Sequence, residues 1–591
     1  MRVAHAFAFV ARAGAFVAVA LGAWSLAHAQ PLPVAPEAPS GWIDKAAVAS
    51  RHFMVAAANP LATQAGYDVL RAGGNAIDAA IAVQLVLGLV EPQASGLGGG
   101  AFLLHHDAKT GRLTAYDGRE TAPAAARPDR FLNADGTPLA FYDAVVGGRS
   151  VGVPGTVKLL EAVHRRHGRL RWSRLFERAI ALADAGFPVS PRLHALVASE
   201  THWSQPRARD YFLTPEGKAR AVGATLRNPA YANTLRTLAA HGTQPFYDGP
   251  IADDIVRTAN GAERNPGDLT RRDLANYTIK VRTPVCGGYR GYRICGMPLP
   301  SSGGITVLQV LGMLAPYDIA SMGAASFWSA HFLSEAERLA YADRSVYMAD
   351  PDFVRAPSGL LDADYLRARS RLISVNRSLG VAMPGDPSRA SERERMREHG
   401  VDAAAEFPST SHIAIVDREG NAVSMTTTIE DQFGSRLMTA GGFLLNNELT
   451  DFSFVPVDGG KPVANRVEPG KRPRSSMAPT IAYDPGGRVA IITGSPGGSA
   501  IINFVVKTLV ALIDWKLDPQ AAIALPNFGS RNGPTELEKD TAVSALKPRL
   551  EALGHRTVVI DQTSGLQAIV RTSRGWIGGA DPRREGIVLG D

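Results

Sequence analysis

The stretch EFPSTSHIAIVDREGNAVSMTTTIEDQFG, residues 406–434, places three hydroxyl residues between a proline-marked loop and an apolar run. The run predicts a strand over residues 412–417, and a second strand-like run follows over 422–429. Serine and threonine residues just before a strand are usually turn residues. The stretch therefore raises the question of whether one of residues 409–411 has a chemical role instead.

Thr410 is the candidate nucleophile of this stretch. A threonine hydroxyl can attack a carbonyl when an adjacent base takes its proton, and the α-amino group of a chain-terminal threonine is such a base. The reference pKa of that amine is about 8, close to working pH. Because Thr410 is internal, the chain would have to cut itself between Ser409 and Thr410. Residues 376–408 are charged and contain prolines, so we predict a mobile linker that suits such a cut.

The composition describes an ordinary globular protein. Of its 591 residues, 45% are apolar and 20% are charged, which leaves ample material for a core. The formal charge of +7 is modest, and the densest charged run, SERERMREHG at 391–400, interleaves glutamate and arginine so that their charges cancel. Nucleic acid is therefore not an expected partner. Helical patterns at 155–167, 325–347 and 500–515, together with the strand-like runs, predict a mixed α and β chain.

The N-terminus predicts a secretory signal peptide. Arg2 precedes an apolar stretch that runs over residues 13–26 and ends in the A-x-A pattern of residues 27–29. The uninterrupted apolar part is shorter than the roughly 20 residues of a spanning helix, which favours a signal peptide over an uncleaved anchor. We therefore expect residues 1–29 to be removed before Gln30, and the mature protein to be exported to the periplasm without a stable membrane span.

The two cysteines lie in one short segment, PVCGGYRGYRICG. If Arg290 and Gly291 form a two-residue hairpin turn, Cys286 and Cys295 lie directly opposite each other, in a non-hydrogen-bonded pair whose side chains are close. An exported compartment permits a disulfide. A structural bridge, or two inert thiols, is favoured over a catalytic cysteine.

Two glycine motifs match known patterns but lack the expected context. Residues 148–152 fit the G-x-S-x-G elbow of α/β-hydrolases, yet residues 153–155, Val-Pro-Gly, delay the helix that follows. Residues 96–101 fit G-x-G-x-x-A, but they follow a helix and precede a strand, the reverse of the order in a dinucleotide site. We predict a structural turn at the first and close backbone packing at the second. No Walker motif, H-E-x-x-H or metal-spaced Cys/His cluster is present in the sequence.

Eight motifs in order carry a family resemblance. From about residue 53 to the C-terminus they are GGNAIDAAIAV, LGGGAF, DGRETAP, PSSGG, TSHIAIVDREGNAVSMTTT, LLNNELTDFS, KRPRSSMAPT and GSPGGSAII. On these motifs the chain resembles the γ-glutamyltranspeptidases, N-terminal-nucleophile hydrolases that mature by autocleavage. The resemblance implies an α+β fold, the αββα sandwich of two stacked β-sheets flanked by helices. It also implies a heterodimer of a large subunit, residues 30–409 with the linker at 376–409, and a small subunit, residues 410–591.

The resemblance assigns the acyl-transfer chemistry to four residues. Thr410 corresponds to the nucleophile, and Thr428 corresponds to the second threonine that hydrogen-bonds it. Gly497 and Gly498 match the pair whose backbone N–H groups form the oxyanion hole. Glycine suits donors that must approach a tetrahedral intermediate closely. Ser409 then supplies the scissile carbonyl.

Six further positions match residues that hold the α-amino-acid group of the substrate. Arginine suits the α-carboxylate because its planar fork can bind a carboxylate through two hydrogen bonds. The clamp on the α-carboxylate matches Arg119, Ser475 and Ser476. The positions that hold the α-ammonium match Glu430, Glu448 and Asp451.

Three features depart from the family pattern. Position 430 is glutamate where many members carry asparagine, although an acid should still bind an ammonium. Ser411 follows the nucleophile where another threonine is common. The segment 452–474 contains no tyrosine and is short for the family's lid over the site, which bears on the balance between water and amino-acid acceptors.

The implied reaction is acyl transfer without a metal or organic cofactor. Thr410 attacks the γ-amide carbonyl of glutathione or a related γ-glutamyl compound, and the resulting ester passes its acyl group to water or to an amino acid or dipeptide. A β-lactam (glutaryl or cephalosporin) acylase of the same fold is the nearest alternative, because it shares the nucleophile and differs in the amine pocket. An exported non-catalytic binding protein is a further alternative, which cleavage into two pieces would argue against.

Overall fold

The computed structural model describes residue 37 and residues 41–387, 399–404 and 409–591. The described residues all belong to one compact unit. The predicted signal peptide, residues 1–29, lies outside the described residues, as does part of the predicted linker. In the described part of the chain, no helix has the length and apolar character needed to cross a membrane.

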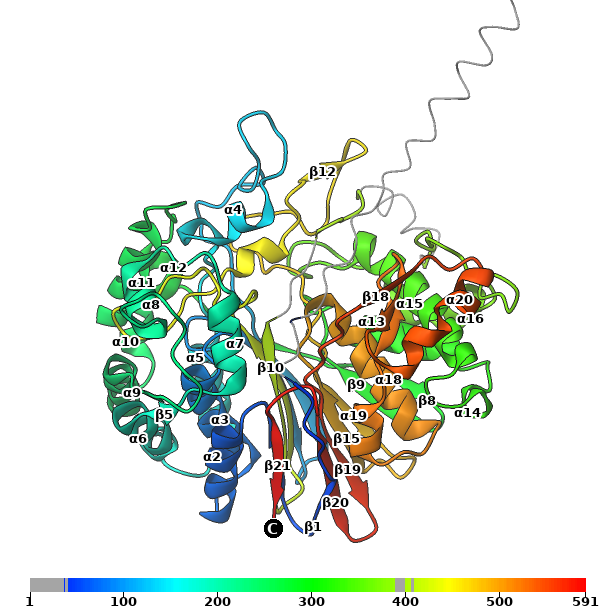
Figure 1. Cartoon of the computed structure of the whole chain (residues 1–591), viewed down its shortest axis with the longest axis horizontal. Helices are drawn as coiled ribbons and strands as arrows, with labels where there is room; N and C mark the ends of the chain where they lie inside the picture. The colour runs from blue at the N-terminus through cyan, green and yellow to red at the C-terminus, as the bar shows by residue number, and fades with distance from the viewer. Residues whose placement is uncertain (1–36, 38–40, 388–398, 405–408) are drawn as a thin grey trace, which may run out of the picture. The chain divides into compact units, whose positions relative to one another are not determined.

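Two seven-stranded antiparallel sheets form the centre of the fold (Figure 1). The first sheet has the strand order β21 (Ile587–Gly590), β2 (Met54–Ala57), β10 (Thr410–Val416), β11 (Ala422–Thr428), β3 (Gly100–Asp107), β4 (Arg112–Gly118) and β7 (Lys280–Arg282). The second has the order β1 (Val48–Ser50), β20 (Gly575–Ala580), β19 (Gln567–Thr572), β15 (Val489–Gly494), β14 (Thr480–Tyr483), β9 (Tyr292–Gly296) and β8 (Val285–Tyr289). The sheets stack face to face, because β10 and β11 contact β15 and β2 contacts β19 and β20.

Helices cover the outer face of each sheet. On the first sheet lie α2 (Pro60–Arg71), α3 (Ala76–Val90) and α5 (Thr156–His167). Around them are α4 (Phe141–Val145), α6 (Glu177–Ala185), α7 (Pro191–Ser199), α8 (Pro206–Phe212), α9 (Pro229–His241), α10 (Gln244–Tyr247), α11 (Pro250–Asn260) and α12 (Arg271–Ala275). These elements lie on the left in Figure 1.

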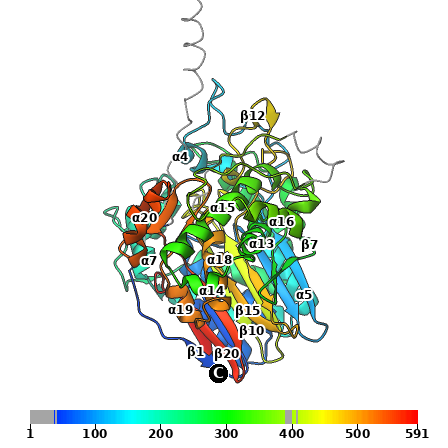
Figure 2. The ribbon, with the colours of Figure 1, turned by 90° about the vertical axis from the view of Figure 1, so that its right-hand side faces the viewer.

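The second sheet is covered by α13 (Gly303–Leu314), α18 (Ile501–Ile513) and α19 (Pro519–Ala524). The helices α14 (Ile319–Met322), α15 (Phe327–Tyr347), α16 (Ala363–Ser370) and α20 (Lys547–Ala552) complete this layer, and Figure 2 views it from the front. A small sheet of β16 (Phe528–Ser530), β17 (Thr535–Glu538) and β18 (Thr557–Ile560) packs beside α15. The αββα sandwich is thereby confirmed.

Strand β10 alternates between two hydrophobic cores. Ile413 and Ile415 pack in the core shared with α3, whereas Ala414 and Val416 pack in the core between the two sheets. Side chains two residues apart point to the same face of a strand. Thr410, at the start of β10, therefore lies on the face that looks toward the second sheet.

The hairpin of β8 and β9 contains the only cysteines of the chain. Tyr289 pairs with Tyr292, and Cys286 pairs with Cys295. Arg290 forms the turn with its following glycine in the left-handed region, with φ angles of 50° and 83°. The two cysteines form a disulfide, which confirms the predicted register and favours the bridge over two free thiols.

The two glycine motifs have structural roles. Ser150 is buried in a 3₁₀ turn and donates from Oγ to the carbonyl oxygen of Val145 (2.6 Å), so it is held inside the turn. At the other motif, a Cβ on Gly99 would lie 2.0 Å from the carbonyl oxygen of Thr428. Glycine at this position thus permits close packing against the end of β11, as predicted.

The described beginning of the predicted linker, residues 376–387, is held to the second-sheet helices. Ser378 Oγ donates to a carboxylate oxygen of Glu335 (2.7 Å), and the backbone N–H of Gly385 donates to Asp343 (2.8 Å). Both acceptors belong to α15. Further along the predicted linker, Asp402 accepts from Asn465 Nδ2 (3.0 Å) and forms an ion pair with Arg474 (2.9 Å), so this described part is anchored as well.

Candidate active site

Thr410 and Thr428 face each other at one end of the β10–β11 hairpin. They are partners in the strand register, and their Oγ atoms are 3.3 Å apart. Both side chains are almost fully buried. The register follows from the hairpin, since a tight turn after Val416 pairs the first residue of β10 with the last residue of β11.

A small pocket opens over this pair. Nine of the ten residues expected to form the site line it, together with Met477 and Ile501. The nine are Arg119, Thr410, Thr428, Glu430, Glu448, Asp451, Ser475, Ser476 and Gly498. The tenth, Gly497, directly precedes Gly498. The structure thus brings together residues from β10, from β11 and from loops more than 300 positions apart.

The Thr428 hydroxyl lies between the candidate nucleophile and the bond to be cut. In the continuous chain it donates to the carbonyl oxygen of Ser409 (2.6 Å). It accepts from Thr410 Oγ (3.3 Å) and from the backbone N–H of Glu430 (2.9 Å). A hydroxyl offers one donor and two acceptor positions, and all three are used. Thr428 therefore contacts both reacting groups at once.

The glycine turn follows β15 and precedes α18. Gly497 and Gly498 have φ angles of 136° and 55°, in the region that favours glycine. A Cβ on Gly497 would lie 2.6 Å from the ring of Phe504, so the turn also has no room for a side chain there. The turn can place backbone N–H groups at the pocket without a side chain in the way.

Arg119 follows the end of β4 and is buried under the pocket. Its guanidinium forms ion pairs with Glu448 and Asp451 and donates to the carbonyl oxygens of Pro473 (3.2 Å) and Arg474 (3.0 Å). Burial acts to lower the pKa of Arg119, but the two carboxylates outweigh it and raise that pKa. The arginine is therefore firmly charged and tied to both acids in the ligand-free pocket.

Two pocket acids hold protons readily. Burial raises the pKa of Glu448 to about 8, against the opposing effect of Arg119. Burial and the nearby charges of Asp451 and Asp431 raise the pKa of Glu430 well above its ordinary value. One oxygen of Glu430, Oε1, is buried and has no hydrogen-bond partner among the described residues. Glu430 thus offers the pocket a carboxyl oxygen without a hydrogen-bond partner, whereas Glu448 and Asp451 are paired with Arg119.

Sequence reasoning missed Glu120. It is fully buried, and burial raises the pKa of its carboxyl to about 8. The Glu448 carboxyl lies close enough to influence its protonation. Its position beside Arg119 in the DGRETAP motif was the available signal, but a lone glutamate gave no reason to place it inside rather than in solvent.

The two serines line the pocket and are held from outside it. Ser476 Oγ accepts from Arg344 (2.7 Å). The carbonyl oxygen of Ser475 accepts from Ser302 Oγ (2.7 Å), and Ser475 N–H donates to the carbonyl oxygen of Pro300 (3.0 Å). The PSSGG motif is thus a support for the serines and does not itself line the pocket.

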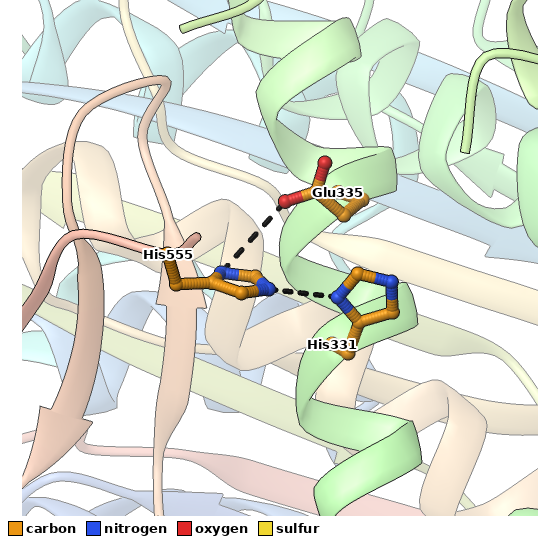
Figure 3. Close-up of side chains that lie close together, drawn as sticks. All are labelled: His331, Glu335 and His555. Carbon is orange, nitrogen blue, oxygen red and sulfur yellow. Dashed lines mark hydrogen bonds and ion pairs between the residues drawn. The ribbon is translucent and has the colours of Figure 1, made fainter. Parts of the chain in front are cut away.

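Among the described residues, one group of metal-ligand side chains comes close together, namely His331, Glu335 and His555 (Figure 3). Its atoms are already hydrogen-bonded. His331 Nδ1 meets His555 Nε2 at 2.7 Å, and the other nitrogen of His555 meets Thr535 Oγ at 2.7 Å. Glu335 accepts from Arg338 Nε at 3.0 Å. We therefore assign the group to the anchoring of α15 to the C-terminal part of the chain.

Comparisons with known proteins agree with this geometry. The profile of the Gamma-glutamyltranspeptidase family matches residues 62–590. The chain is 38% identical to the glutathione hydrolase proenzyme of Bacillus subtilis (strain 168) and 37% identical to that of Escherichia coli (strain K12), each over 91% of both chains. Among solved structures, the cephalosporin acylase from Bacillus halodurans superposes with a TM-score of 0.80 at 28% identity, covering 93% of this chain and 97% of the acylase.

Proposed function

The chain belongs to the γ-glutamyltranspeptidase family, and from this premise we propose that it is an autoprocessed γ-glutamyltransferase and glutathione hydrolase with Thr410 as its nucleophile. One observation carries the proposal. A single pocket contains the threonine pair, the glycine turn and both charge types needed to bind an α-amino acid. The fold alone would not separate this activity from others on the same sandwich.

Maturation is a cut between Ser409 and Thr410. Thr410 Oγ attacks the Ser409 carbonyl carbon, and the Thr428 hydroxyl donates to the carbonyl oxygen as negative charge develops there. The peptide C–N bond breaks, the nitrogen takes up a proton and becomes the α-amine of Thr410, and Ser409 is left as an ester on Oγ. Water hydrolyses the ester. The products are residues 30–409 and 410–591, which remain together as a heterodimer.

Turnover repeats this chemistry on a γ-glutamyl amide. The free α-amine of Thr410 takes the proton from Oγ, which attacks the γ-carbonyl carbon. Backbone N–H groups of Gly497 and Gly498 stabilise the oxyanion. The leaving amine takes the proton and departs, which leaves a γ-glutamyl ester on Thr410. Water then gives glutamate, whereas an amino acid or dipeptide gives a new γ-glutamyl amide.

The pocket charges suit a zwitterionic α-amino acid. We assign the α-carboxylate to Arg119 with the two serines, and the α-ammonium to the acids. Because Arg119 is already paired with Glu448 and Asp451, a bound zwitterion exchanges these two internal pairings for two new ones, its carboxylate with Arg119 and its ammonium with the acids. Glu430 adds an acidic oxygen without a partner, which an ammonium can occupy.

The mature protein is assigned to the periplasm, on the basis of the N-terminal signal pattern. Its donors are glutathione and related γ-glutamyl compounds, and its acceptors are amino acids or dipeptides. Neither nucleic acid nor a cofactor has a role in this mechanism. The segment 452–474 is short and contains no tyrosine where the family has its lid, so it bears on the balance between water and amino-acid acceptors.

A comparison of two anilides tests the proposal against the acylase alternative. γ-Glutamyl anilide and glutaryl anilide offer the same scissile amide, but only the first carries an α-ammonium. Without it, the acids at 430, 448 and 451 face one another with Arg119 as the only counter-charge. When a substrate analogue lacks a group and its binding partners in the site stay buried and unpaired, kcat/KM for that analogue falls by a factor on the order of 10⁴.

We expect a kcat/KM preference for γ-glutamyl anilide of about that size, reduced sharply by Asp451→Ala. Asp540→Ala, at a highly exposed aspartate, serves as the control and should keep the parental ratio. Equal or better turnover of glutaryl anilide by the parent would place the protein with the acylases. A protein that stays as one chain and turns over neither compound would instead be the non-catalytic binding protein.

A further inference from the structure

Helix α15 (Phe327–Tyr347) carries buried polar side chains at every third or fourth position along one side. They are His331, Glu335, Arg338, Tyr341 and Arg344. This spacing follows the helical repeat, and the set extends along about 20 Å of helix. A buried polar group costs free energy unless it is hydrogen-bonded. Each of these side chains therefore needs a specific partner, and the partners show what the helix holds.

The side chains of His331 and Arg338 hold α15 in place through partners outside the helix. His331 Nε2 faces the carbonyl oxygen of Ser374 (2.8 Å), so that nitrogen carries the proton and Nδ1 is the acceptor of the bond from His555 (Figure 3). Arg338 Nη2 donates to Thr535 Oγ (2.6 Å), which in turn bonds His555. The bonds to His555 and Thr535 join α15 to residues that follow the proposed cut in the sequence.

The second half of the set reaches the active site without lining its pocket. The Tyr341 hydroxyl donates to the carbonyl oxygen of Ser499, the residue after the glycine pair. On its other side, Ser499 Oγ accepts from Arg531 (2.9 Å). The turn that presents the backbone N–H groups is therefore clamped between α15 and the β16–β17 loop.

Arg344, one turn further along, holds the serine pair. Its Nη2 donates to Ser476 Oγ and its Nε donates to Ser302 Oγ, each at 2.7 Å. Ser302 Oγ donates onward to the carbonyl oxygen of Ser475 (2.7 Å). One guanidinium thus sets the positions of both serines through two separate bonds.

We propose that Tyr341 and Arg344 are positioning residues with separate effects, Tyr341 on the chemical step and Arg344 on substrate binding. This inference rests on the proposed function. A shift of the glycine turn weakens hydrogen bonds that matter most in the transition state, so it lowers kcat. A shift of the serines weakens contacts to the α-carboxylate in both ground and transition states, so it raises KM.

Two conservative variants separate these effects. Tyr341→Phe removes only the hydroxyl. Arg344→Lys keeps the charge but cannot donate in the fixed fork that reaches Ser302 and Ser476 together. Tyr347→Phe is the matched control, because Tyr347 also lies on α15 and its hydroxyl donates to a backbone carbonyl oxygen, that of Gly385 (2.6 Å), away from the pocket.

The experiment uses cleaved, full-length enzyme and γ-glutamyl anilide. It measures the rate of the first, acyl-enzyme-forming turnover, the KM, and the inhibition constant of glutamate, which reports binding without chemistry. For Tyr341→Phe we expect the acylation rate to fall about tenfold, with the glutamate constant within about twofold of the parent. For Arg344→Lys we expect KM and the glutamate constant to rise about tenfold, with acylation little changed. Tyr347→Phe should match the parent in all three.

Parental kinetics in Tyr341→Phe, or an equal loss in Tyr347→Phe, would overturn the assignment of Tyr341. An unchanged KM in Arg344→Lys would overturn that of Arg344. If Tyr341→Phe does not fold, Ser499→Ala is used in its place, because Ser499→Ala removes the hydrogen bond from Arg531 to the same turn. An acylation rate equal to that of the parent in Ser499→Ala would then refute the need for a clamped turn. A parent inactive on γ-glutamyl anilide would refute the proposed function instead, so the two failures are distinguishable.

Discussion

Replacing Thr428 by valine removes one hydroxyl and keeps the branched shape of the side chain. In the continuous chain that hydroxyl donates to the carbonyl oxygen of Ser409 at 2.6 Å and accepts from Thr410 Oγ and from Glu430 N–H. As Thr410 attacks, negative charge develops on the Ser409 oxygen. Valine leaves this charge without its side-chain donor, so self-cleavage should slow.

The expected size follows from the geometry. Removing one donor of an oxyanion hole costs about 10²–10³ in rate, or about 2.7–4 kcal/mol of activation free energy. The unpaired carbonyl and N–H groups lower the free energy of unfolding by about 1–3 kcal/mol. The backbone ladder of β11 with β10 and β3 does not involve the hydroxyl. The chain should therefore fold and remain uncleaved for far longer than the parent.

The assay purifies the uncleaved chain after brief expression in the cold and follows its conversion to two pieces by denaturing gel and intact mass. Thr428→Ser, which keeps the hydroxyl, should cleave at close to the parental rate. Thr427→Val is the matched control, because Thr427 lies on the same strand as Thr428 and this change also removes one hydroxyl hydrogen bond, that to the carbonyl oxygen of Gly100 (3.3 Å). Parental cleavage of Thr428→Val, or equal slowing of Thr427→Val, would refute the reasoning.

Three further outcomes are expected. Thr410→Ala should remain one inactive chain, and a cut at the 409–410 bond in the purified variant, seen by intact mass, would mean that another group attacks. Because burial raises the pKa of Glu448 to about 8 and that of Glu430 as well, both acids lose protons as the ammonium binds. The KM for γ-glutamyl anilide should therefore fall as pH rises from about 6 to about 8. Initial rates measured over this pH range should show a weaker fall in KM for Glu448→Gln. Replacing Cys286 and Cys295 together by serine should lower the free energy of unfolding in denaturant by no more than a few kcal/mol, because the closed loop is short, and should leave kcat and KM unchanged.

The local parts of this fold could be predicted from the sequence. The apolar run after Thr410 and the threonine-rich run that follows it have the composition of buried strands, and the structure confirms both as β10 and β11. A short turn between them pairs the ends of the hairpin, so the contact between Thr410 and Thr428 depends only on nearby residues. The disulfide register of the β8–β9 hairpin could be predicted for the same reason.

The distant contacts could not be derived from spacing. Arg119 and Glu448 are 329 positions apart, and no periodicity relates them. Family resemblance could suggest that both belong to the site, but it could not show that they pair with each other in the ligand-free pocket. The burial of Glu120 depends on how the loop after β4 packs beside Gly100 and Gly152. The contacts of Tyr341 and Arg344 depend on how α15 packs against the glycine turn and the serine pair. Such packing is a property of the assembled layers.

In the proposed mechanism, the single proton of the Thr428 hydroxyl links maturation to turnover. Before the cut, that proton is donated to the Ser409 carbonyl oxygen, and Thr428 Oγ can only accept from Thr410. After the cut, Ser409 no longer presents an amide carbonyl at this position, so the proton becomes available for donation to Thr410 Oγ. In this proposal the same side chain would then orient the nucleophile instead of polarising its target. Because the backbone N–H of Glu430 holds Thr428 Oγ from the opposite side in the uncleaved chain, the hydroxyl needs only to rotate its proton, and the heavy atoms of the site can keep their positions through both reactions.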